Sequence, residues 1–287
     1  MRMNPNKQKR CLTLQDYSCM GRCSLSEALP TLSACGIEAV GIPTAILSNH
    51  TAGFKSWTYR DLKEDILPII DKWKDYEHHF DAIYTGYLGD SQVPIILKAI
   101  DSLRTKDTLI AVDPAFADNK KLYPGFKETH IEEMRKLLKK ADIIFPNLTE
   151  ACFLANEEMG KIDQYDEDFV KSVEMKLANE APSFVIISGI HFNPKEVGCL
   201  AYDKKRGAFF KYSTENIGEF HGAGDLFASS FVGSFLNGFS LEESLRISHN
   251  FVHEAMRITL ENKDLPSFYG LEFERAIPYL IKSLSKK

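Results

Sequence analysis

The stretch EFHGAGDLFASSF, residues 219–231, sets an aspartate directly behind a glycine-rich turn. Gly222 and Gly224 permit backbone angles that most residues cannot reach, and they leave no side chain over the turn. From Asp225 onward, apolar and small residues fill most positions, which predicts a helix buried on nearly all sides. The unpaired N–H groups of its first turn, together with the helix dipole, would then form a site for an anion.

This segment alone leaves two interpretations of Asp225 open. Aspartate at the start of a helix is a common cap, because its carboxylate accepts hydrogen bonds from the unpaired N–H groups. The same carboxylate could instead be a general base aimed at a hydroxyl group, beside a turn that holds a phosphate. The choice between the two depends on what the rest of the chain brings to this turn.

The composition indicates an ordinary soluble protein rather than a nucleic-acid-binding or membrane protein. The 287 residues are 44% hydrophobic and 26% charged, which suits a single α/β domain with a large core. The net charge of −5 argues against a nucleic-acid partner. No apolar run reaches about eighteen residues and no signal peptide is evident, so we expect a cytoplasmic protein without a membrane span. Six cysteines without paired C-x-x-C spacing predict reduced thiols and no zinc site.

Short apolar runs alternate with longer helical patterns along the chain. We expect strands at 10–15, 37–42, 82–86, 108–112, 142–145, 184–188, 198–202 and 207–212, and helices at 24–35, 59–76, 90–104, 129–140, 148–156, 165–179, 224–238, 240–261 and 270–284. This alternation predicts a mainly parallel sheet covered on both faces, with a hairpin around Lys204–Gly207. Ser240 and Glu243 have the spacing of a capping box. We expect one domain over residues 1–287, with 1–8 as a flexible tail.

Polar side chains follow several of the expected strands. Each could be a simple cap or turn residue, and Asn147 and Asp90 are good caps by type. The carboxyl ends of parallel strands meet at one edge of a sheet, however, and ligands bind there. Carboxylates and an amide beside a phosphate-sized turn predict a magnesium–nucleotide site, although the sequence contains no G-x-x-x-x-G-K-[ST] motif. The residues in question are Asp113, Asp118, Asn147, Glu150, Ser188 and Asp225.

Five segments together resemble one known family. HGAGDLFASSF resembles the G-[TA]-G-D anion-hole motif of the ribokinase-like superfamily, and PNLTEA (146–151) resembles its N-x-x-E metal-site motif. VDPAFAD (112–118) is similar to the D-P-x-x-x-D of its vitamin B6 branch. SNHTAGFKSW (48–57) resembles the S-N-H-T-G-Y block of pyridoxal kinases, and YTGYLGD (84–90) resembles their T-G-Y segment. The order and spacing match over nearly the whole chain.

The resemblance implies a three-layer α/β/α ribokinase-like fold with a mainly parallel central sheet, and a homodimer. It also implies ATP-dependent phosphorylation of the 5′-hydroxymethyl group of pyridoxal, pyridoxine or pyridoxamine. On the phosphoryl side, Asp225 would be the base and the N–H groups of Gly222, Ala223 and Gly224 would stabilise the transferring phosphoryl group. Asn147, Ser188 and Gly189 would bind the nucleotide phosphates. Asp118 and Glu150 would hold Mg²⁺ through water, and Asp113 would serve a monovalent cation such as K⁺.

On the vitamin side, the resemblance implies that Thr51 and Tyr87 hold the ring, with Asp16 facing a ring nitrogen or substituent. Two residues depart from the pyridoxal kinase pattern. Asp16 replaces a usual serine, and hydroxymethylpyrimidine kinases often have an aspartate around there. Leu47 replaces an aromatic residue that usually packs on the ring. A hydroxymethylpyrimidine kinase of thiamine synthesis and a non-catalytic ligand-binding relative therefore remain alternatives. His50 and His221 are interpreted as structural hydrogen-bonding residues, because Asp225 already supplies a base.

Overall fold

A nine-stranded sheet forms the centre of the computed structural model, which describes residues 8–76, 79–160 and 165–285. Residues 1–7, most of the expected tail, lie outside the described residues. In spatial order the strands are β11 (Ala208–Glu215), β10 (Glu196–Asp203), β9 (Phe184–Asn193), β8 (Ile143–Ile144), β5 (Leu109–Val112), β4 (Ala82–Thr85), β1 (Arg10–Ser18), β2 (Glu38–Leu47) and β3 (Tyr59–Asp61). The pairs from β9 to β2 are parallel, while β10, β11 and β3 run antiparallel to their neighbours.

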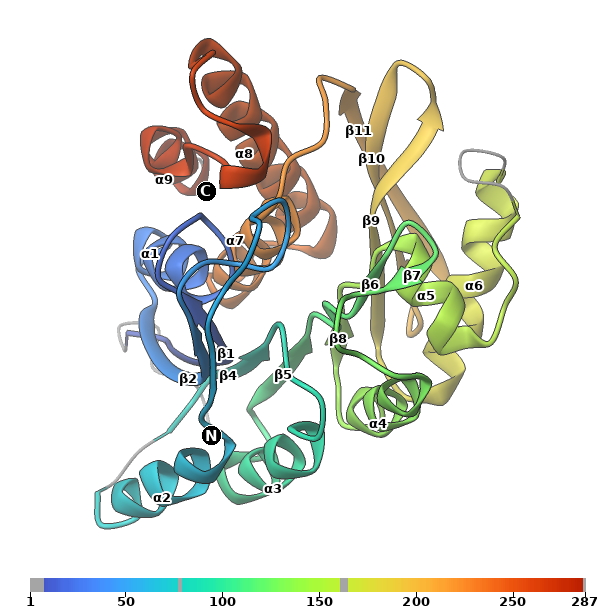
Figure 1. Cartoon of the computed structure of the whole chain (residues 1–287). Helices are drawn as coiled ribbons and strands as arrows, with labels where there is room; N and C mark the ends of the chain where they lie inside the picture. Colours follow the sequence, from blue (N-terminus) through green and yellow to red (C-terminus); the bar gives the residue numbers. More distant parts are fainter. Residues whose placement is uncertain (1–7, 77–78, 161–164, 286–287) are drawn as a thin grey trace.

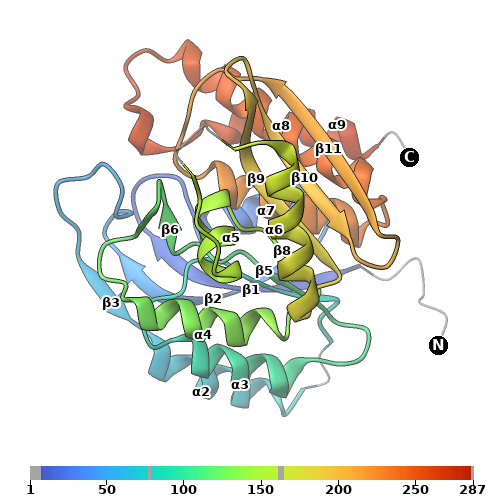
Figure 2. The same ribbon diagram turned by 90° about the vertical axis from the view of Figure 1, so that its right-hand side faces the viewer.

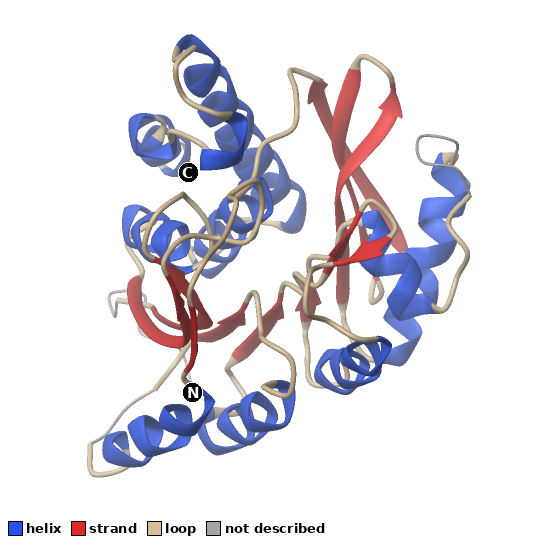
Figure 3. Ribbon diagram, viewed as in Figure 1, coloured by secondary structure: helices blue, strands red, loops and turns tan. Residues whose placement is uncertain are grey.

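Helices cover both faces of this sheet, as Figures 1 and 2 show. On one face lie α1 (Leu25–Ala34), α7 (Ala223–Leu236), α8 (Leu241–Glu261) and α9 (Ile277–Leu284). On the other lie α2 (Lys63–Trp73), α3 (Val93–Leu103), α4 (Glu128–Leu138), α5 (Leu148–Ala155) and α6 (Glu167–Glu180). Two separate hydrophobic clusters fill the two interfaces. The expected three-layer α/β/α architecture is therefore confirmed, and Figure 3 shows the layers by element type.

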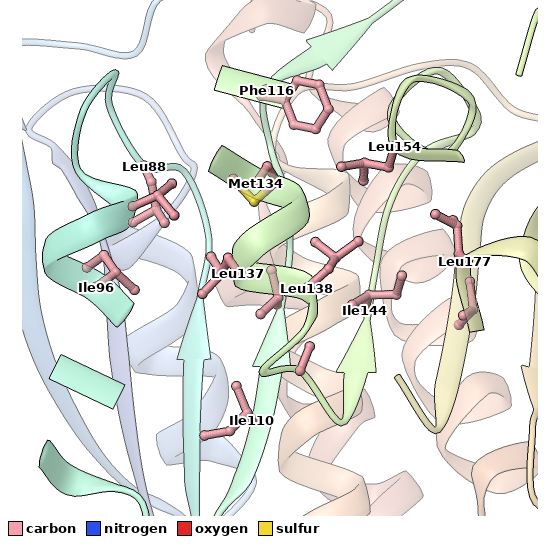
Figure 4. Close-up of a cluster of buried hydrophobic side chains, with 14 of the residues drawn as sticks. Leu88, Ile96, Ile110, Phe116, Met134, Leu137, Leu138, Ile144, Leu154 and Leu177 are labelled. Atoms are coloured by element: carbon pink, nitrogen blue, oxygen red, sulfur yellow. The ribbon is translucent and has the colours of Figure 1, made fainter. Parts of the chain in front are cut away.

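The sequence of the strands explains why both faces are covered. All four residues of β4 are buried, as are the last three of β5, so neither strand has a solvent face. Figure 4 shows how Met134 and Leu137 of α4 pack over Ile110 and Ile144 of the sheet. In the opposite layer, α7 buries every residue from Leu226 to Ser234. The prediction that this helix is buried on nearly all sides is confirmed.

Several local predictions are confirmed in detail. Ser240 and Glu243 form the capping box at the start of α8, with the Ser240 N–H donating to Glu243 Oε2 at 2.8 Å. The expected hairpin joins β10 to β11 and pairs Asp203 with Ala208. No helix among the described residues is both long and apolar enough to cross a membrane.

Other local predictions were wrong. Residues 59–61 form the edge strand β3 against β2 rather than the start of a helix, and α2 begins at Lys63. Helix α3 begins at Val93 with Gln92 as its N-cap, so Asp90 is not a cap. The expected helix at 270–284 starts only at Ile277, because Gly270 has a φ of 100° and the short 3₁₀ helices Ser267–Tyr269 (η1) and Phe273–Arg275 (η2) precede it. Strands β1 and β2 extend to Ser18 and Leu47, which places Asp16 within a strand.

Candidate active site

A cavity of about 380 Å³ opens at the carboxyl ends of the central strands, between the start of α7 and the start of α5. This is the edge where open α/β sheets bind ligands. Its lining contains every residue expected on the phosphoryl side, namely Asp113, Asp118, Asn147, Glu150, Ser188, Gly189, Gly222, Ala223, Gly224 and Asp225. The residues expected on the vitamin side (Asp16, Leu47, Thr51 and Tyr87) are not part of the described lining. The fold therefore assembles one half of the predicted site in a single cavity.

Gly222 starts α7 in a left-handed conformation, with φ of 82° and ψ of −12°. A Cβ atom at this position would lie 2.6 Å from the Arg22 carbonyl oxygen and 2.7 Å from Glu27 Oε1. Both the backbone angle and the close packing therefore require glycine. A Cβ at Gly224 would meet no protein atom within 4 Å. The turn is packed tightly on one side at Gly222 and left open at Gly224, as an anion site needs.

Asp225 does not cap α7. The N-cap residue is Gly222, and no side chain makes a capping hydrogen bond at this end of the helix. Its carboxylate instead accepts a hydrogen bond from the backbone N–H of Ser24. Burial raises the pKa of Asp225 to about 7, with repulsion from Asp16 adding to the rise and the Ser24 hydrogen bond opposing it. A carboxylate with a pKa near neutrality in a cavity is suited to accept a proton.

Ser24 was missed by sequence reasoning, and it links the two halves of the site. Its φ of 49° and ψ of −132° are unusual for a residue with a side chain. Its N–H bonds to Asp225 while its hydroxyl bonds to Asp16. Strained backbone of this kind persists where surrounding structure holds it, often at functional sites. No local pattern signals it, since the contact spans most of the chain.

Two buried carboxyl groups, Asp113 and Glu150, lie near the strand ends, and the half-buried Asp225 lies close by at the start of α7. Burial, then Glu150 and Asp225, raises the pKa of Asp113 well above its usual range. Burial raises the pKa of Glu150 to about 7, although three backbone hydrogen bonds oppose the shift. A divalent cation would relieve this mutual repulsion, so the residues fit a hard cation. The described residues hold no cluster of three His, Cys, Asp or Glu side chains spaced to bind a metal ion by themselves.

Asn147 and Glu150 form a capping box at the start of α5. Glu150 Oε1 accepts from the N–H groups of Phe116 and Ala117 at 2.8 and 3.2 Å, and Oε2 accepts from Asn147 N–H at 3.0 Å. Asn147 Nδ2 in turn donates to the Ala117 carbonyl at 2.7 Å. The cap interpretation of Asn147 is thus confirmed, and the pair also fixes the segment that leads into the small hairpin of β6 (Ala117–Asp118) and β7 (Lys121–Leu122).

Strand β9 does not end at Ser188 as expected, but runs on to Asn193. Gly189 has a φ of 67°, and the register with β10 shifts opposite Ser188. The strand is therefore kinked where it meets the cavity, and Ser188 pairs with Asn147 only through an isolated bridge. Such a kink exposes backbone groups of Ser188 and Gly189 to a ligand.

The vitamin-side residues surround a different region, beside the cavity. Asp16 is buried, accepts a 3.0 Å hydrogen bond from Ser18 Oγ, and has a pKa raised by burial. The ring of Tyr87 lies 5.5 Å from that of Phe126, and the charge of Asp16 contributes to raising the pKa of Tyr87. Leu47 is buried at the end of β2 and Thr51 is half-buried in the loop that follows. The charge of Asp16 therefore acts on Tyr87, although burial is the larger cause of the raised pKa of Tyr87.

The two histidines lie together above the glycine turn, with ring centroids 5.7 Å apart. Burial lowers the pKa of each; His221 lowers the pKa of His50 further, and Asp118 opposes the shift of His221. His50 Nδ1 accepts from the Ala52 N–H at 3.3 Å and its ring contacts Phe54, which fits the expected structural role. His221 lines the cavity.

One end of the cavity was not foreseen. His249, Val252, His253 and Met256 of α8 line it, together with Val197 and Thr214. His249 Nε2 lies 2.9 Å from Thr214 Oγ1, and burial lowers the pKa of His249 to about 4, with His253 contributing. The spacing 249, 252, 253, 256 places these residues on one face of the helix. This spacing was the pattern in the sequence from which a shared face could have been predicted. Mixed polar and apolar side chains of this kind suit a flat heterocycle.

The chain is similar to known kinases over most of its length. The family model for phosphomethylpyrimidine kinase matches residues 27–266. Pyridoxal kinase PdxY of Haemophilus influenzae is 27% identical over 271 residues, covering 88% of this chain and 90% of its own. A crystal structure from Bacteroides thetaiotaomicron, of a candidate phosphomethylpyrimidine kinase in a form with pyridoxal, is 34% identical with a TM-score of 0.90 and covers 96% of each chain. Pyridoxal kinase from Lactobacillus plantarum is 25% identical, with a TM-score of 0.87, and covers 96% of this chain and 98% of its own.

Proposed function

Because this chain belongs to the phosphomethylpyrimidine kinase family, and to the pyridoxal kinase branch of the ribokinase-like superfamily, we propose that it phosphorylates vitamin B6. The γ-phosphoryl group of ATP passes to the 5′-hydroxymethyl group of pyridoxal, pyridoxine or pyridoxamine. The observation that carries this proposal is that Gly222 and Asp225 lie together at the start of α7. A left-handed glycine turn opens beside a carboxyl group with a pKa of about 7, in a cavity lined by further carboxyl groups.

Asp225 acts as the general base. It accepts the proton of the hydroxymethyl group while the oxygen attacks the γ-phosphorus, and the bond from phosphorus to the ADP oxygen breaks. The Ser24 N–H orients the Asp225 carboxylate for this transfer. The backbone N–H groups of Gly222, Ala223 and Gly224 stabilise the negative charge on the transferring phosphoryl oxygens.

The rest of the cavity holds the nucleotide. Asn147, Ser188 and Gly189 bind the phosphates, and the end lined by His249, Val252 and Met256 receives the base. Asp118 and Glu150 would hold Mg²⁺, and Asp113 would serve a monovalent cation such as K⁺. Bound Mg²⁺ would neutralise charge on the phosphates. The raised pKa values of Asp113 and Glu150 support a cation here.

The vitamin ring binds between Tyr87 and the loop that carries Thr51, near Leu47, with Asp16 facing a protonated ring nitrogen or the ammonium group of pyridoxamine. A second function is favoured by the same Asp16, because a buried carboxyl also suits a hydroxymethylpyrimidine ring with its amino group. We further propose that the protein works in the cytoplasm as a homodimer.

A substrate panel tests the proposal. The purified protein is incubated with ATP, Mg²⁺ and each of pyridoxal, pyridoxine, pyridoxamine and hydroxymethylpyrimidine, and the phosphate esters are measured. We expect a B6 vitamer to have the highest kcat/KM. A highest value for hydroxymethylpyrimidine would select the second function, and no phosphate ester from any of the four would reject both.

A further inference from the structure

Glu27, in the first turn of α1, has no role in the mechanism above, yet it is one of the most unusual groups in the protein. Its relative exposure is 0%, and among the described residues neither carboxyl oxygen has a hydrogen-bond partner. Burying an ionised carboxylate without partners is costly, whereas a neutral carboxyl group is tolerated far better. A buried acid of this kind calls for an explanation in its surroundings.

The carboxyl group of Glu27 lies directly against the glycine turn. A Cβ atom on Gly222 would be 2.7 and 2.8 Å from its two oxygens, so the side chain occupies the space that the missing Cβ leaves. The neighbouring atom on the same side is the Arg22 carbonyl oxygen. Glu27 therefore supports from within the protein the turn whose open side faces the cavity.

The charges around Glu27 are mainly negative. Asp225 on α7 and Glu274 on η2 both repel it, and the thiol of Cys23 in the preceding loop is also affected by its charge. Arg22 is the opposing cation, but its Nε donates to Glu274 Oε1 at 2.9 Å, and its buried Nη1 has no hydrogen-bond partner in the part of the chain that the structure describes. Asp16 on β1 adds a further negative charge that acts on Asp225 and Cys23.

We propose that Glu27 is a positioning residue that must stay uncharged for phosphate to bind. As a neutral acid it packs behind Gly222 and holds the turn in place. As a carboxylate it would put a second negative charge beside Asp225, behind the N–H groups that face the phosphate. This inference rests on the proposed function, since it concerns the phosphate site of the same cavity.

The order of ionisation gives the inference its pH dependence. Burial, then Asp225 and Glu274, raises the pKa of Glu27 well above its usual range, with Arg22 opposing. The charge of ionised Asp225 disfavours ionisation of Glu27, so the two groups resist being charged together. The active window is the pH range in which Asp225 is charged and Glu27 is neutral. Above it, kcat/KM for ATP and the affinity for ADP should fall, by up to about tenfold per pH unit.

The test compares wild type with Glu27→Gln, which keeps the shape and cannot ionise. Calorimetric ADP binding and kcat/KM for ATP are measured between about pH 6.5 and 9.5. We expect ADP affinity and kcat/KM for ATP to fall at alkaline pH in wild type but not in Glu27→Gln. The fall of kcat/KM at acid pH should be the same in both proteins. Glu274→Gln is the matched control. It removes a repulsion and releases Arg22 toward Glu27, so the alkaline fall should move to lower pH.

Thermal unfolding provides a readout that does not depend on catalysis. Because the pKa of Glu27 is raised by folding, its neutral form stabilises the protein below the unfolded pKa, and that contribution is lost as pH rises through the folded pKa. The Tm of Glu27→Gln should therefore rise relative to wild type with increasing pH. If Glu27→Gln does not fold, Glu27→Met serves for the same comparison, since it also cannot ionise.

An alkaline fall in ADP affinity that persists unchanged in the Glu27 variant, or no such fall in wild type, would overturn the inference. These outcomes are distinct from failure of the proposed reaction. If no B6 vitamer is phosphorylated but ADP affinity and Tm follow the expected pH dependence, Glu27 keeps its role and only the acceptor substrate is wrong.

Discussion

The phosphoryl half and the vitamin half of the site are built in different ways. The phosphoryl half combines carboxyl side chains with backbone groups at the strand ends and at the start of α7, where the geometry depends on glycine conformation. The proposed vitamin half depends on side chains from β1, from the end of β2 and the loop after it, and from the segment after β4. In the proposed function, the first half carries out the reaction and the second half selects the substrate. Substitutions in the two halves should therefore fail in different ways.

Asp225→Asn should cause the largest loss. The side chain keeps its shape but loses the ability to accept the hydroxyl proton, which typically costs about 10²- to 10⁴-fold in kcat. ADP binding should be retained, because the phosphate-binding N–H groups remain, and Tm should not fall, because folding disfavours the ionised form of Asp225. Single-turnover phosphoryl transfer with the best vitamer measures the effect, and a variant within about threefold of wild type would remove Asp225 from the base role.

The fall of kcat/KM at acid pH should also depend on Asp225. With a pKa of about 7 in the free enzyme, Asp225 is increasingly protonated below neutrality, and kcat/KM should fall about tenfold per pH unit there. Asp16→Asn removes a repulsive charge, so it should lower the pKa of Asp225 and move the acid limb to lower pH. A limb that stays in place in Asp16→Asn would contradict the electrostatic link between the two halves.

Gly222→Ala and Gly224→Ala form a matched pair within one turn. Alanine at 222 must adopt a φ of 82° and meet atoms of Arg22 and Glu27 at under 3 Å, so we expect about 1–3 kcal/mol lower stability together with lower activity. Alanine at 224 meets no protein atom, so its Tm should be close to wild type. Denaturant unfolding of both variants checks this. Equal destabilisation would mean that Gly224 is also packed.

Asp16→Ser should change substrate preference rather than overall rate. A carboxylate pairs with the ammonium of pyridoxamine, whereas it repels an aldehyde that faces it, so wild type should handle pyridoxamine or pyridoxine at least as well as pyridoxal. Losing a charge–donor contact of about 1.5–3 kcal/mol should move the ratio of kcat/KM values toward pyridoxal by about tenfold or more. A wild type that strongly prefers pyridoxal, with an unmoved ratio in the variant, would show that Asp16 does not face the substrate.

Glu150→Gln should have the smallest effect on turnover at saturating metal. Loss of one carboxylate weakens the cation site, so the Mg²⁺ concentration for half-maximal rate should rise by a few fold. Glu150 accepts hydrogen bonds from backbone N–H groups, and the NH₂ group of glutamine cannot accept them. If that group faces one of these N–H groups, a hydrogen bond and some stability are lost as well. An unchanged Mg²⁺ titration would locate the metal elsewhere and leave Glu150 as a cap alone.

The residues predicted for the phosphoryl half line one cavity, and the sequence could bring them together because their signals are local. The turn at Gly222, the start of α7 and the polar residues Asp113 and Asn147 at strand ends are readable within short windows. The contacts of Ser24 with Asp225, and of Glu27 with Gly222, join segments about two hundred residues apart and follow only from the packing of α1 on α7. The edge strand at Tyr59 was missed for the same reason, since pairing with β2 rather than local periodicity decides its form.

The burial of α7 limits how far this helix can move during the proposed reaction. Leu226 to Ser234 pack against both the sheet and neighbouring helices, and the Ser229 and Ser230 hydroxyls donate to carbonyls within the helix at 2.6 and 2.7 Å. Between Leu226 and Ser234 the helix has no solvent-facing side, so it cannot slide or tilt without opening voids in a close-packed layer. In the proposed mechanism its first-turn dipoles would therefore need little reorganisation as charge moves onto the phosphoryl oxygens. The rigidity of a deeply buried apolar helix is, in this sense, part of the catalyst.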